Sequence, residues 1–188
     1  MYLLVGLGNP GMQYANTRHN IGFDALIALA QQYHIDVPHK KKHNALISDG
    51  TIAHVPCILA LPQQFMNLSG QPVISLMTFH KIPPQNVIVV HDDLDLPFAS
   101  VKLKQKGGHG GHNGLRDIIK HIGEGFIRVR MGIGRPPENW DTSSFVLGKW
   151  TKQEQNSMPD MFRTSMEAIE SIVRDGILGA MQKFNVKS

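Results

Sequence analysis

The sequence predicts an α/β fold in which helices pack on both faces of a twisted, parallel or mixed sheet, giving three layers. Two observations predict this class. Short apolar runs with strand character recur along the chain, at residues 3–7, 57–61 and 87–90. Segments with apolar residues at helical spacing alternate with them, at residues 23–30, 73–80 and 115–122. Because no repeat or linker interrupts the alternation, we expect one domain over residues 1–188.

The first half of the chain predicts two units of strand, loop and helix. The first apolar run is closed by a Gly-Asn-Pro-Gly turn, and the helical stripe that follows begins at Phe23. The second run stops at Pro62. Its helix follows Ser69 and Pro72, residue types that suit a helix start.

The second half continues the alternation. The β-branched run at residues 87–90 is typical of a buried strand and ends abruptly in polar residues. A helix over residues 115–122 follows the glycine-rich segment 107–111. Residues 127–133 then alternate apolar side chains with arginines, which predicts a half-exposed strand. Two amphipathic helices close the chain, at residues 162–173 and 177–184.

Composition limits the class of protein. The chain has 188 residues, one cysteine and a formal net charge of +4. Cys57 has no partner for a disulfide, no apolar stretch approaches the roughly 20 residues that cross a bilayer, and the start lacks the basic residues of a signal peptide. We therefore expect a soluble, cytoplasmic protein. Basic residues at 39–43 and 102–106 favour a polyanionic partner, although a solvated basic face has the same composition.

Polar residues gather where the predicted strands end. Asn9 follows the first strand, Asn67 the second and Asp92 the third, while His112 and Asn113 begin a helix. In open α/β sheets the binding crevice lies beyond the carboxyl ends of the strands, so we expect the active site there. Each asparagine alone has a structural alternative as a turn residue or helix cap.

His19 is the candidate general base. It lies between the first loop and the first helix, where it belongs to the core of neither. Asp92 offers a carboxylate that can hold the tautomer of the imidazole and stabilise its charged form. The sequence has no Gly-x-Ser-x-Gly motif, and Cys57 lies in an apolar run. Direct attack by water is therefore favoured over a covalent intermediate.

Two competing motifs are weaker. Residues 6–11 match the dinucleotide pattern G-x-G-x-x-G, but the helical stripe begins about ten residues later, so no helix N-terminus meets a pyrophosphate. Side chains of the metal-ligand type also occur, but the pair at 109 and 112 lies in a glycine loop rather than on a helix, and neither an H-E-x-x-H motif nor a cysteine pair accompanies it. The candidate ligands are His91, Asp92, Asp93, Asp95, His109 and His112. We expect no cofactor and rank a metal second.

Five ordered motifs resemble the bacterial peptidyl-tRNA hydrolase family. They are Gly-Leu-Gly-Asn-Pro-Gly at 6–11, Tyr14 with Thr-Arg-His-Asn-Ile-Gly at 17–22, Phe-Met-Asn-Leu-Ser-Gly at 65–70, His-Asp-Asp-Leu-Asp-Leu-Pro at 91–97 and Gly-His-Gly-Gly-His-Asn-Gly-Leu-Arg-Asp at 108–117. The similarity extends through Phe-Val-Leu-Gly at 145–148 and includes the chain length, so it covers nearly the whole sequence.

The resemblance implies a usually monomeric, single-domain enzyme with a mixed sheet and no metal in the hydrolysis. It makes His19 the catalytic base and Asp92 the carboxylate that orients it. The residues it places around the peptide and the reacting ester are Asn9, Tyr14, Asn20, Met66, Asn67, His112 and Asn113. The cations it places against tRNA are Lys102, Lys104 and Arg130.

Two segments are not assigned by the resemblance. The loop at 134–144 corresponds to one that covers the cleft in the family, but Glu138 and Asp141 make it less basic than in some relatives. The basic run at 39–43 is interpreted as a solvated loop. Two other functions are compatible with parts of the sequence: a non-catalytic RNA-binding relative, which should have lost His19 or Asp92, and a metal-dependent hydrolase, which a chelator should inactivate.

Overall fold

A seven-stranded mixed sheet forms the centre of the molecule, which a computed structural model describes over residues 1–186. The strand order is β2-β3-β4-β1-β5-β7-β6. The strands are β1 (Tyr2–Gly6), β2 (Lys40–Lys42), β3 (Ala45–Ile52), β4 (Val55–Pro62), β5 (Val87–Asp93), β6 (Val101–Gln105) and β7 (Ile127–Gly132). The central strands β4, β1, β5 and β7 are parallel, whereas β2, β3 and β6 run antiparallel to their neighbours. The predicted α/β fold class is confirmed.

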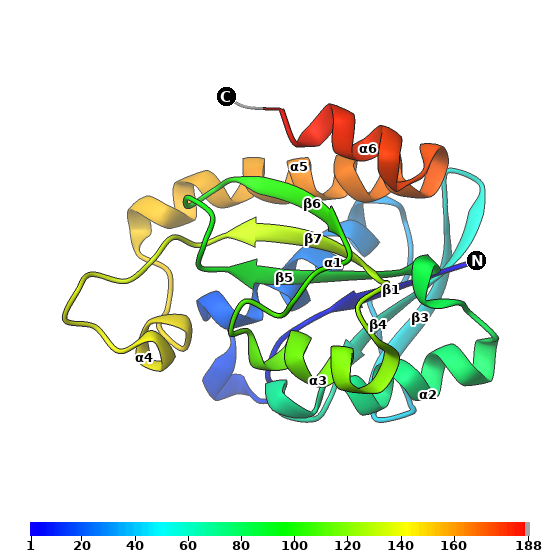
Figure 1. The fold of residues 1–188 in the computed structure, drawn as a ribbon, viewed down its shortest axis with the longest axis horizontal. Helices are drawn as coiled ribbons and strands as arrows, with labels where there is room; N and C mark the ends of the chain where they lie inside the picture. Colours follow the sequence, from blue (N-terminus) through cyan, green and yellow to red (C-terminus); the bar gives the residue numbers. More distant parts are fainter. Residues whose placement is uncertain (187–188) are drawn as a thin grey trace.

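Helices cover both faces of the sheet (Figure 1). The α-helices are α1 (Ile21–Gln32), α2 (Gly70–His80), α3 (Asn113–Ile122), α4 (Thr142–Val146), α5 (Lys152–Asp175) and α6 (Ile177–Phe184). Short 3₁₀ turns are η1 (Met12–Tyr14), η2 (Arg18–Asn20), η3 (Met66–Leu68) and η4 (Pro84–Asn86). Among the described residues, none of the helices combines the length and apolar character that crossing a membrane requires.

Alternation along the central strands creates two cores. Leu4, Ile88 and Val90 pack with α1 and α5 on one face. Val5 and Val89 pack with α2 and α3 on the other. Because successive side chains point to opposite faces, strands covered on both faces must be apolar throughout, as the runs at 3–7 and 87–90 are.

Several elements differ from the sequence prediction. The basic run predicted as a solvated loop is instead the exposed edge strand β2, and lysines on an edge strand discourage pairing with another chain. The strand predicted as half-exposed, β7, is almost wholly buried because β6, which the sequence did not predict, covers its edge and Arg128 folds over the Phe126 ring. The helix α5 begins ten residues before the predicted start at 162, at a capping box formed by Thr151 and Glu154, and contains Pro159.

The edge strand β6 is closed by a side chain from the end of the chain. The Leu103 N–H donates to Asn185 Oδ1 at 2.8 Å, and Asn185 Nδ2 donates to the Leu103 carbonyl oxygen at 2.8 Å. One amide thus satisfies the donor and the acceptor that a neighbouring strand would satisfy. In Figure 1 α6 lies above β6, and the arrows of β5 and β7 point left, towards α4, where the site lies.

Candidate active site

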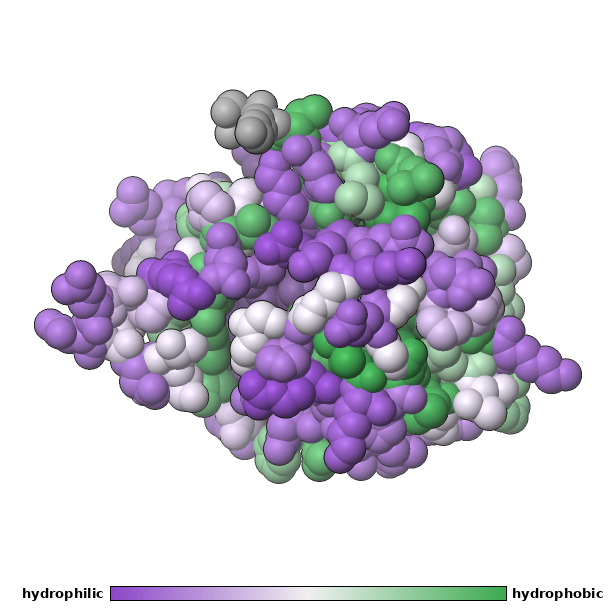
Figure 2. Space-filling view, in the orientation of Figure 1, coloured by the Kyte–Doolittle hydropathy of each residue, from purple (hydrophilic) through white to green (hydrophobic). Residues whose placement is uncertain are grey.

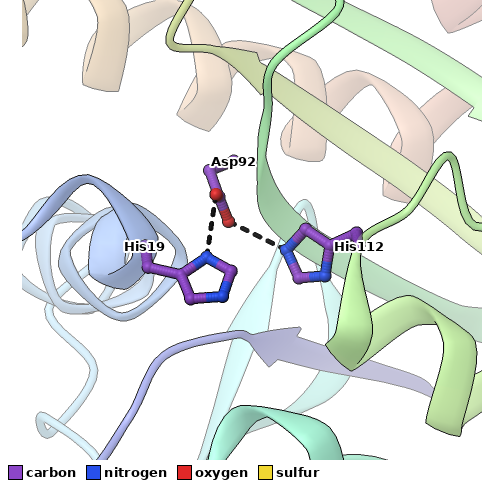
Figure 3. Close-up of side chains that lie close together, drawn as sticks. All are labelled: His19, Asp92 and His112. Carbon is purple, nitrogen blue, oxygen red and sulfur yellow. Dashed lines mark hydrogen bonds and ion pairs between the residues drawn. The ribbon is translucent and has the colours of Figure 1, made fainter. Parts of the chain in front are cut away.

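Three side chains converge beyond the carboxyl ends of the strands (Figure 3). His19 Nδ1 lies 2.8 Å from Asp92 Oδ2, and His112 Nε2 lies 2.8 Å from Asp92 Oδ1. The Asp92 carboxylate therefore contacts one imidazole with each oxygen. His19 and His112 are also close to each other, with ring centroids 5.0 Å apart. The contact between His19 and Asp92 expected from the sequence is present.

Each side chain comes from a different type of element. Asp92 is the penultimate residue of β5, so the sheet fixes it at the carboxyl edge. His19 lies in the turn η2, which leads directly into α1. His112 is the N-cap residue of α3, and its Nδ1 accepts the N–H groups of Gly114 and Leu115 at 3.1 and 3.3 Å. Strand, turn and helix cap position the three groups independently.

These hydrogen bonds determine the tautomers. Because His112 Nδ1 accepts backbone N–H groups, its ring proton lies on Nε2 and is donated to Asp92. The carboxylate can only accept, so His19 donates from Nδ1. His19 Nε2 keeps its lone pair and has no hydrogen-bond partner within residues 1–186. This tautomer can take a proton from water.

The charges in the site are set by burial and by pairing. Burial lowers the pKa of His19, but the charge of Asp92 and the hydrogen bond to it raise that pKa, and the net pKa lies above 6.5. Burial raises the pKa of Asp92, but His19 and His112 lower it further, and the net pKa is far below 3.8. Asp92 is therefore an anion at neutral pH.

His91 lies against Asp92 and His112, and the sequence suggests for it only the role of a metal ligand. It is 2% exposed, and its Nδ1 donates to the Asp92 carbonyl oxygen at 2.8 Å. Burial, together with the neighbouring His112, lowers the pKa of His91 to about 4. An uncharged imidazole thus packs against the His112 ring, with centroids 5.2 Å apart, and adds no positive charge to the site.

The three side chains open into a cleft of about 280 Å³. His19, Asp92, His112 and Asn113 line it, together with Lys104 and Arg130. One wall is α4, which contributes Thr142, Ser143 and Val146. The sequence did not predict this helix, because its five residues are too few for a periodic pattern; the only local signal is Asp141, whose carboxylate accepts the Ser144 N–H.

Asn9, Asn20 and Met66 do not line this cleft but form a buried joint behind it. The Asn20 side chain accepts the Asn9 N–H at 2.8 Å and donates to the Asn9 carbonyl at 2.9 Å. Asn9 Oδ1 accepts the Met66 N–H at 2.7 Å. Met66 packs against Gly114, where an added Cβ would lie 2.7 Å from its sulfur. The joint ties the loop after β1 to η2, η3 and α3.

Tyr14 and Asn67 lie on the η3 side of the site, outside the lining of the cleft. The Tyr14 ring meets the exposed Phe65 ring edge to face, with centroids 6.3 Å apart. Asn67 is exposed and its amide has no hydrogen-bond partner in the described part of the chain. Asn113 is also exposed, but its Oδ1 accepts from Arg116 Nη1 at 3.0 Å, which leaves its Nδ2 as a donor.

Cations lie on the α3 face of β6 and β7. The register pairs Lys102 with Arg130 and Lys104 with Arg128. Arg128 is committed to the Gly107 and Gly108 carbonyls, and Lys102 Nζ donates to the Val186 carbonyl. Arg130 donates from Nε to Asp93 at 2.8 Å, and its terminal nitrogens have no protein partner among residues 1–186. Figure 2 shows the hydrophilic surface where β6 lies.

His19, Asp92 and His112 are residue types that can bind a metal. One ligand atom from each lies within 4.8 Å of the other two, a spacing that a metal can bridge. However, both Asp92 oxygens accept ring N–H groups and His112 Nδ1 accepts two backbone N–H groups. A metal on these atoms would have to replace hydrogen bonds that already satisfy them, so the donor set does not fit a dedicated metal site.

Together, fold and site define an enzyme class: an α/β protein whose histidine–carboxylate pair lies in a cleft at the carboxyl edge of the sheet. The family model described as Peptidyl-tRNA hydrolase matches residues 3–188. The chain belongs to this family, which confirms the resemblance predicted from its motifs.

Known relatives match this chain over nearly its whole length, in sequence and in structure. Peptidyl-tRNA hydrolase from Roseiflexus sp. (strain RS-1) is 46% identical, covering 98% of this chain and 86% of the relative. That of Clostridium novyi (strain NT) is 43% identical over 98% of both chains. The crystal structure of peptidyl-tRNA hydrolase from Acinetobacter baumannii superposes with a TM-score of 0.93 at 39% identity, covering 100% of this chain and 96% of that one.

Replacing Asp92 with asparagine should lower the pKa of His19. The carboxylate is the group that raises this pKa, so the remaining effect of burial should bring it below 6.5. Titration of the His19 ring by NMR measures the change. Asp93→Asn is the matched control, because Asp93 pairs with Arg130 instead of His19. An unchanged or raised pKa in Asp92→Asn would show that Asp92 does not control His19.

Proposed function

We propose that the chain hydrolyses the ester bond between peptide and tRNA in peptidyl-tRNA, releasing free tRNA and an N-blocked peptide for reuse in translation. His19 activates the water and Asp92 orients His19. The observation that carries the proposal is the 2.8 Å bond from His19 Nδ1 to Asp92, which leaves Nε2 open at a cleft lined by cations. Membership of the peptidyl-tRNA hydrolase family supports the substrate class.

The reaction requires one activated water and no covalent intermediate. His19 Nε2 removes a proton as the water oxygen bonds to the ester carbon, and the resulting imidazolium is stabilised by Asp92. The bond to the terminal ribose then breaks, and His19 returns the proton to the departing ribose oxygen. The products are a peptide carboxylic acid and a free ribose hydroxyl, and His19 regains its starting tautomer.

Asparagine amides are suited to stabilise the developing oxyanion. The oxygen of Asn113 is held by Arg116 and that of Asn9 by the Met66 N–H, so each can present its Nδ2 as a donor. Asn113 lines the cleft beside His112 and is the better placed of the two. A donor already oriented by the protein costs little reorganisation when charge develops.

Asn67 is suited to recognise the first peptide bond of the substrate. Its amide is exposed and has neither its donor nor its acceptor committed within residues 1–186. A peptide bond offers one N–H and one C=O, which this amide can pair, whereas a free aminoacyl ester lacks that bond and carries a charged amine. Recognition here would spare aminoacyl-tRNA. Tyr14 and Met66 support the same side of the site through η3.

Lys104 and Arg130 are the cations best placed to bind the tRNA backbone. Both line the cleft, and the terminal nitrogens of Arg130 are uncommitted within the described chain. Lys102 shares their face of the sheet, but its ammonium is hydrogen-bonded to the Val186 carbonyl, so its contribution should be smaller. Asp93 and Asp95 pair with Arg130 and Arg135, which reduces the repulsion of a phosphate near the cleft.

We further propose that the enzyme is monomeric and acts in the cytoplasm, where its tRNA substrate is found. The closing helices are consistent with a monomer, since Val173 of α5 and Ala180 of α6 are buried within the chain. Light scattering measures the mass in solution.

His19→Ala should reduce kcat for N-acetyl-aminoacyl-tRNA by roughly 10²- to 10⁴-fold, the usual contribution of a general base. Release of labelled N-acetyl-amino acid measures the effect, with chelator present throughout. The matched control is His54→Ala, in the turn at the opposite edge of the sheet. Near-normal turnover by His19→Ala would remove His19 as the base, and inactivation of the wild type by chelator would favour metal chemistry.

Lys104→Gln should raise KM for the tRNA substrate and leave kcat almost unchanged, because a phosphate contact binds ground state and transition state alike. The slope of log affinity against log salt should fall in magnitude by about 1. Lys102→Gln should have a smaller effect, and Lys41→Gln on the distant edge strand β2 is the control. Equal effects at all three positions would indicate general charge attraction instead of a contact.

The double variant Asn67→Ala, Asn113→Ala should lose selectivity for blocked substrates. The ratio of kcat/KM for N-acetyl-aminoacyl-tRNA to that for aminoacyl-tRNA should fall by at least about tenfold, the equivalent of one hydrogen bond. The single variants separate the two residues, and Asn86→Ala is the control because the Asn86 side chain donates to the Met1 carbonyl, away from the cleft. A ratio unchanged in the double variant would exclude both residues from this recognition.

A further inference from the structure

Arg18, the residue before His19, is a buried cation that the proposed chemistry does not use. It is 6% exposed. Its Nη2 donates to Glu154 Oε1 at 2.9 Å, and its Nη1 donates to the Phe145 carbonyl at 3.2 Å. The guanidinium also lies over the Phe145 ring, 4.3 Å from its centroid, and 5.5 Å from that of Trp150. Burying an arginine is costly, and its Nε is buried without a hydrogen-bond partner among the described residues, so its retention here calls for a role.

Every partner of the Arg18 side chain lies more than 100 residues away, around α4 and the start of α5. Phe145 belongs to α4, the wall of the cleft. Glu154 Oε1 also accepts the Thr151 N–H at 2.9 Å and so forms the cap of α5. The backbone joins the same contact, since the Arg18 N–H donates to the Gly148 carbonyl at 3.0 Å. Arg18 therefore fastens the wall of the cleft to the turn η2.

His19 lies in the middle of that turn, between two anchors. On one side Arg18 is fixed to α4 and α5. On the other side Asn20 is fixed to Asn9 by two hydrogen bonds, at 2.8 and 2.9 Å. Because η2 spans only Arg18–Asn20, moving either anchor must move the His19 backbone. The Asn20 anchor ties His19 to the loop after β1, whereas the Arg18 anchor ties it to α4 and the start of α5.

We propose that Arg18 is a positioning residue that couples α4 to His19, so that its contacts with the wall of the cleft hold the base in its reactive position. This inference rests on the proposed role of His19. Arg18 touches neither substrate nor the reacting atoms and acts through the residue beside it. An arginine suits the task because its planar fork donates to two acceptors while its face stacks on rings, and lysine offers neither property.

The test compares three variants in the hydrolysis of N-acetyl-aminoacyl-tRNA. Arg18→Gln removes the ion pair and should lower kcat by roughly 10- to 100-fold with KM unchanged, because a misplaced base affects only the transition state. Arg18→Lys keeps the charge opposite Glu154 and should recover part of kcat. Gly148→Ala keeps every charge but places a methyl group 2.8 Å from Arg18 Nη1, and it should lower kcat in the same direction.

Two controls separate positioning from loss of stability. Arg174→Gln removes an arginine from the same helix as Glu154, at an exposed ion pair that does not contact η2. Ile172→Val removes a buried methyl group from the core beneath α5 and so lowers stability without touching η2. Its thermal midpoint is compared with that of Arg18→Gln, so that kcat is judged between variants of similar stability. Both controls should keep kcat within twofold of the wild type.

The outcomes test the role of Arg18 separately from the role of His19. If His19→Ala is inactive while folded Arg18→Gln and Gly148→Ala keep wild-type kcat, the coupling is wrong and the base stands. If the loss appears in KM alone, Arg18 acts in binding and the coupling is wrong. If Ile172→Val loses as much kcat at equal stability, the effect is general destabilisation. If His19→Ala keeps its activity, both proposals fail.

Discussion

The buried carboxylate of Asp92 is the group on which the rest of the site depends. A single buried anion must be paired, and Asp92 is paired with two imidazole N–H groups, one on each oxygen. His112 reaches it only because α3 begins there and supplies backbone donors to the other ring nitrogen. The start of α3 thus fixes which nitrogen of His112 carries a proton, and the shared carboxylate fixes the same for His19.

Around that anion, hydrogen bonds of two asparagines and one arginine hold the loops in place. The side-chain oxygens of Asn9 and Asn20 accept hydrogen bonds from backbone N–H groups. Asparagines that the sequence suggests as substrate-binding residues therefore also connect loops of the fold. The two roles are compatible because an amide has a separate donor and acceptor. In Asn9 the side-chain oxygen accepts the Met66 N–H, while the side-chain NH₂ can still donate to a substrate. One residue can therefore stabilise the fold and bind substrate.

Most of the fold and the centre of the site could be predicted because their signals are local. A buried parallel strand is apolar at every position, and a polar residue just after it must lie at the edge of the sheet, which identified Asp92. The edge strands and α4 were missed because few residues form them and long-range contacts stabilise them. The turn between β3 and β4 uses Ala53 and His54 at positive φ, without the glycine that normally marks such a hairpin. The partners of Arg18 lie 127 and 136 residues away and leave no local pattern.

The amide of Asn185 that closes β6 also affects how the chain folds during synthesis. Until residue 185 has been synthesised and has docked, the N–H and C=O of Leu103 face solvent on an open strand edge. Open edges recruit strands from other chains, so a nascent or trimmed chain is exposed to aggregation at this place for as long as the amide is absent. The residue that follows the last helix therefore closes the edge of the strand that carries Lys102 and Lys104.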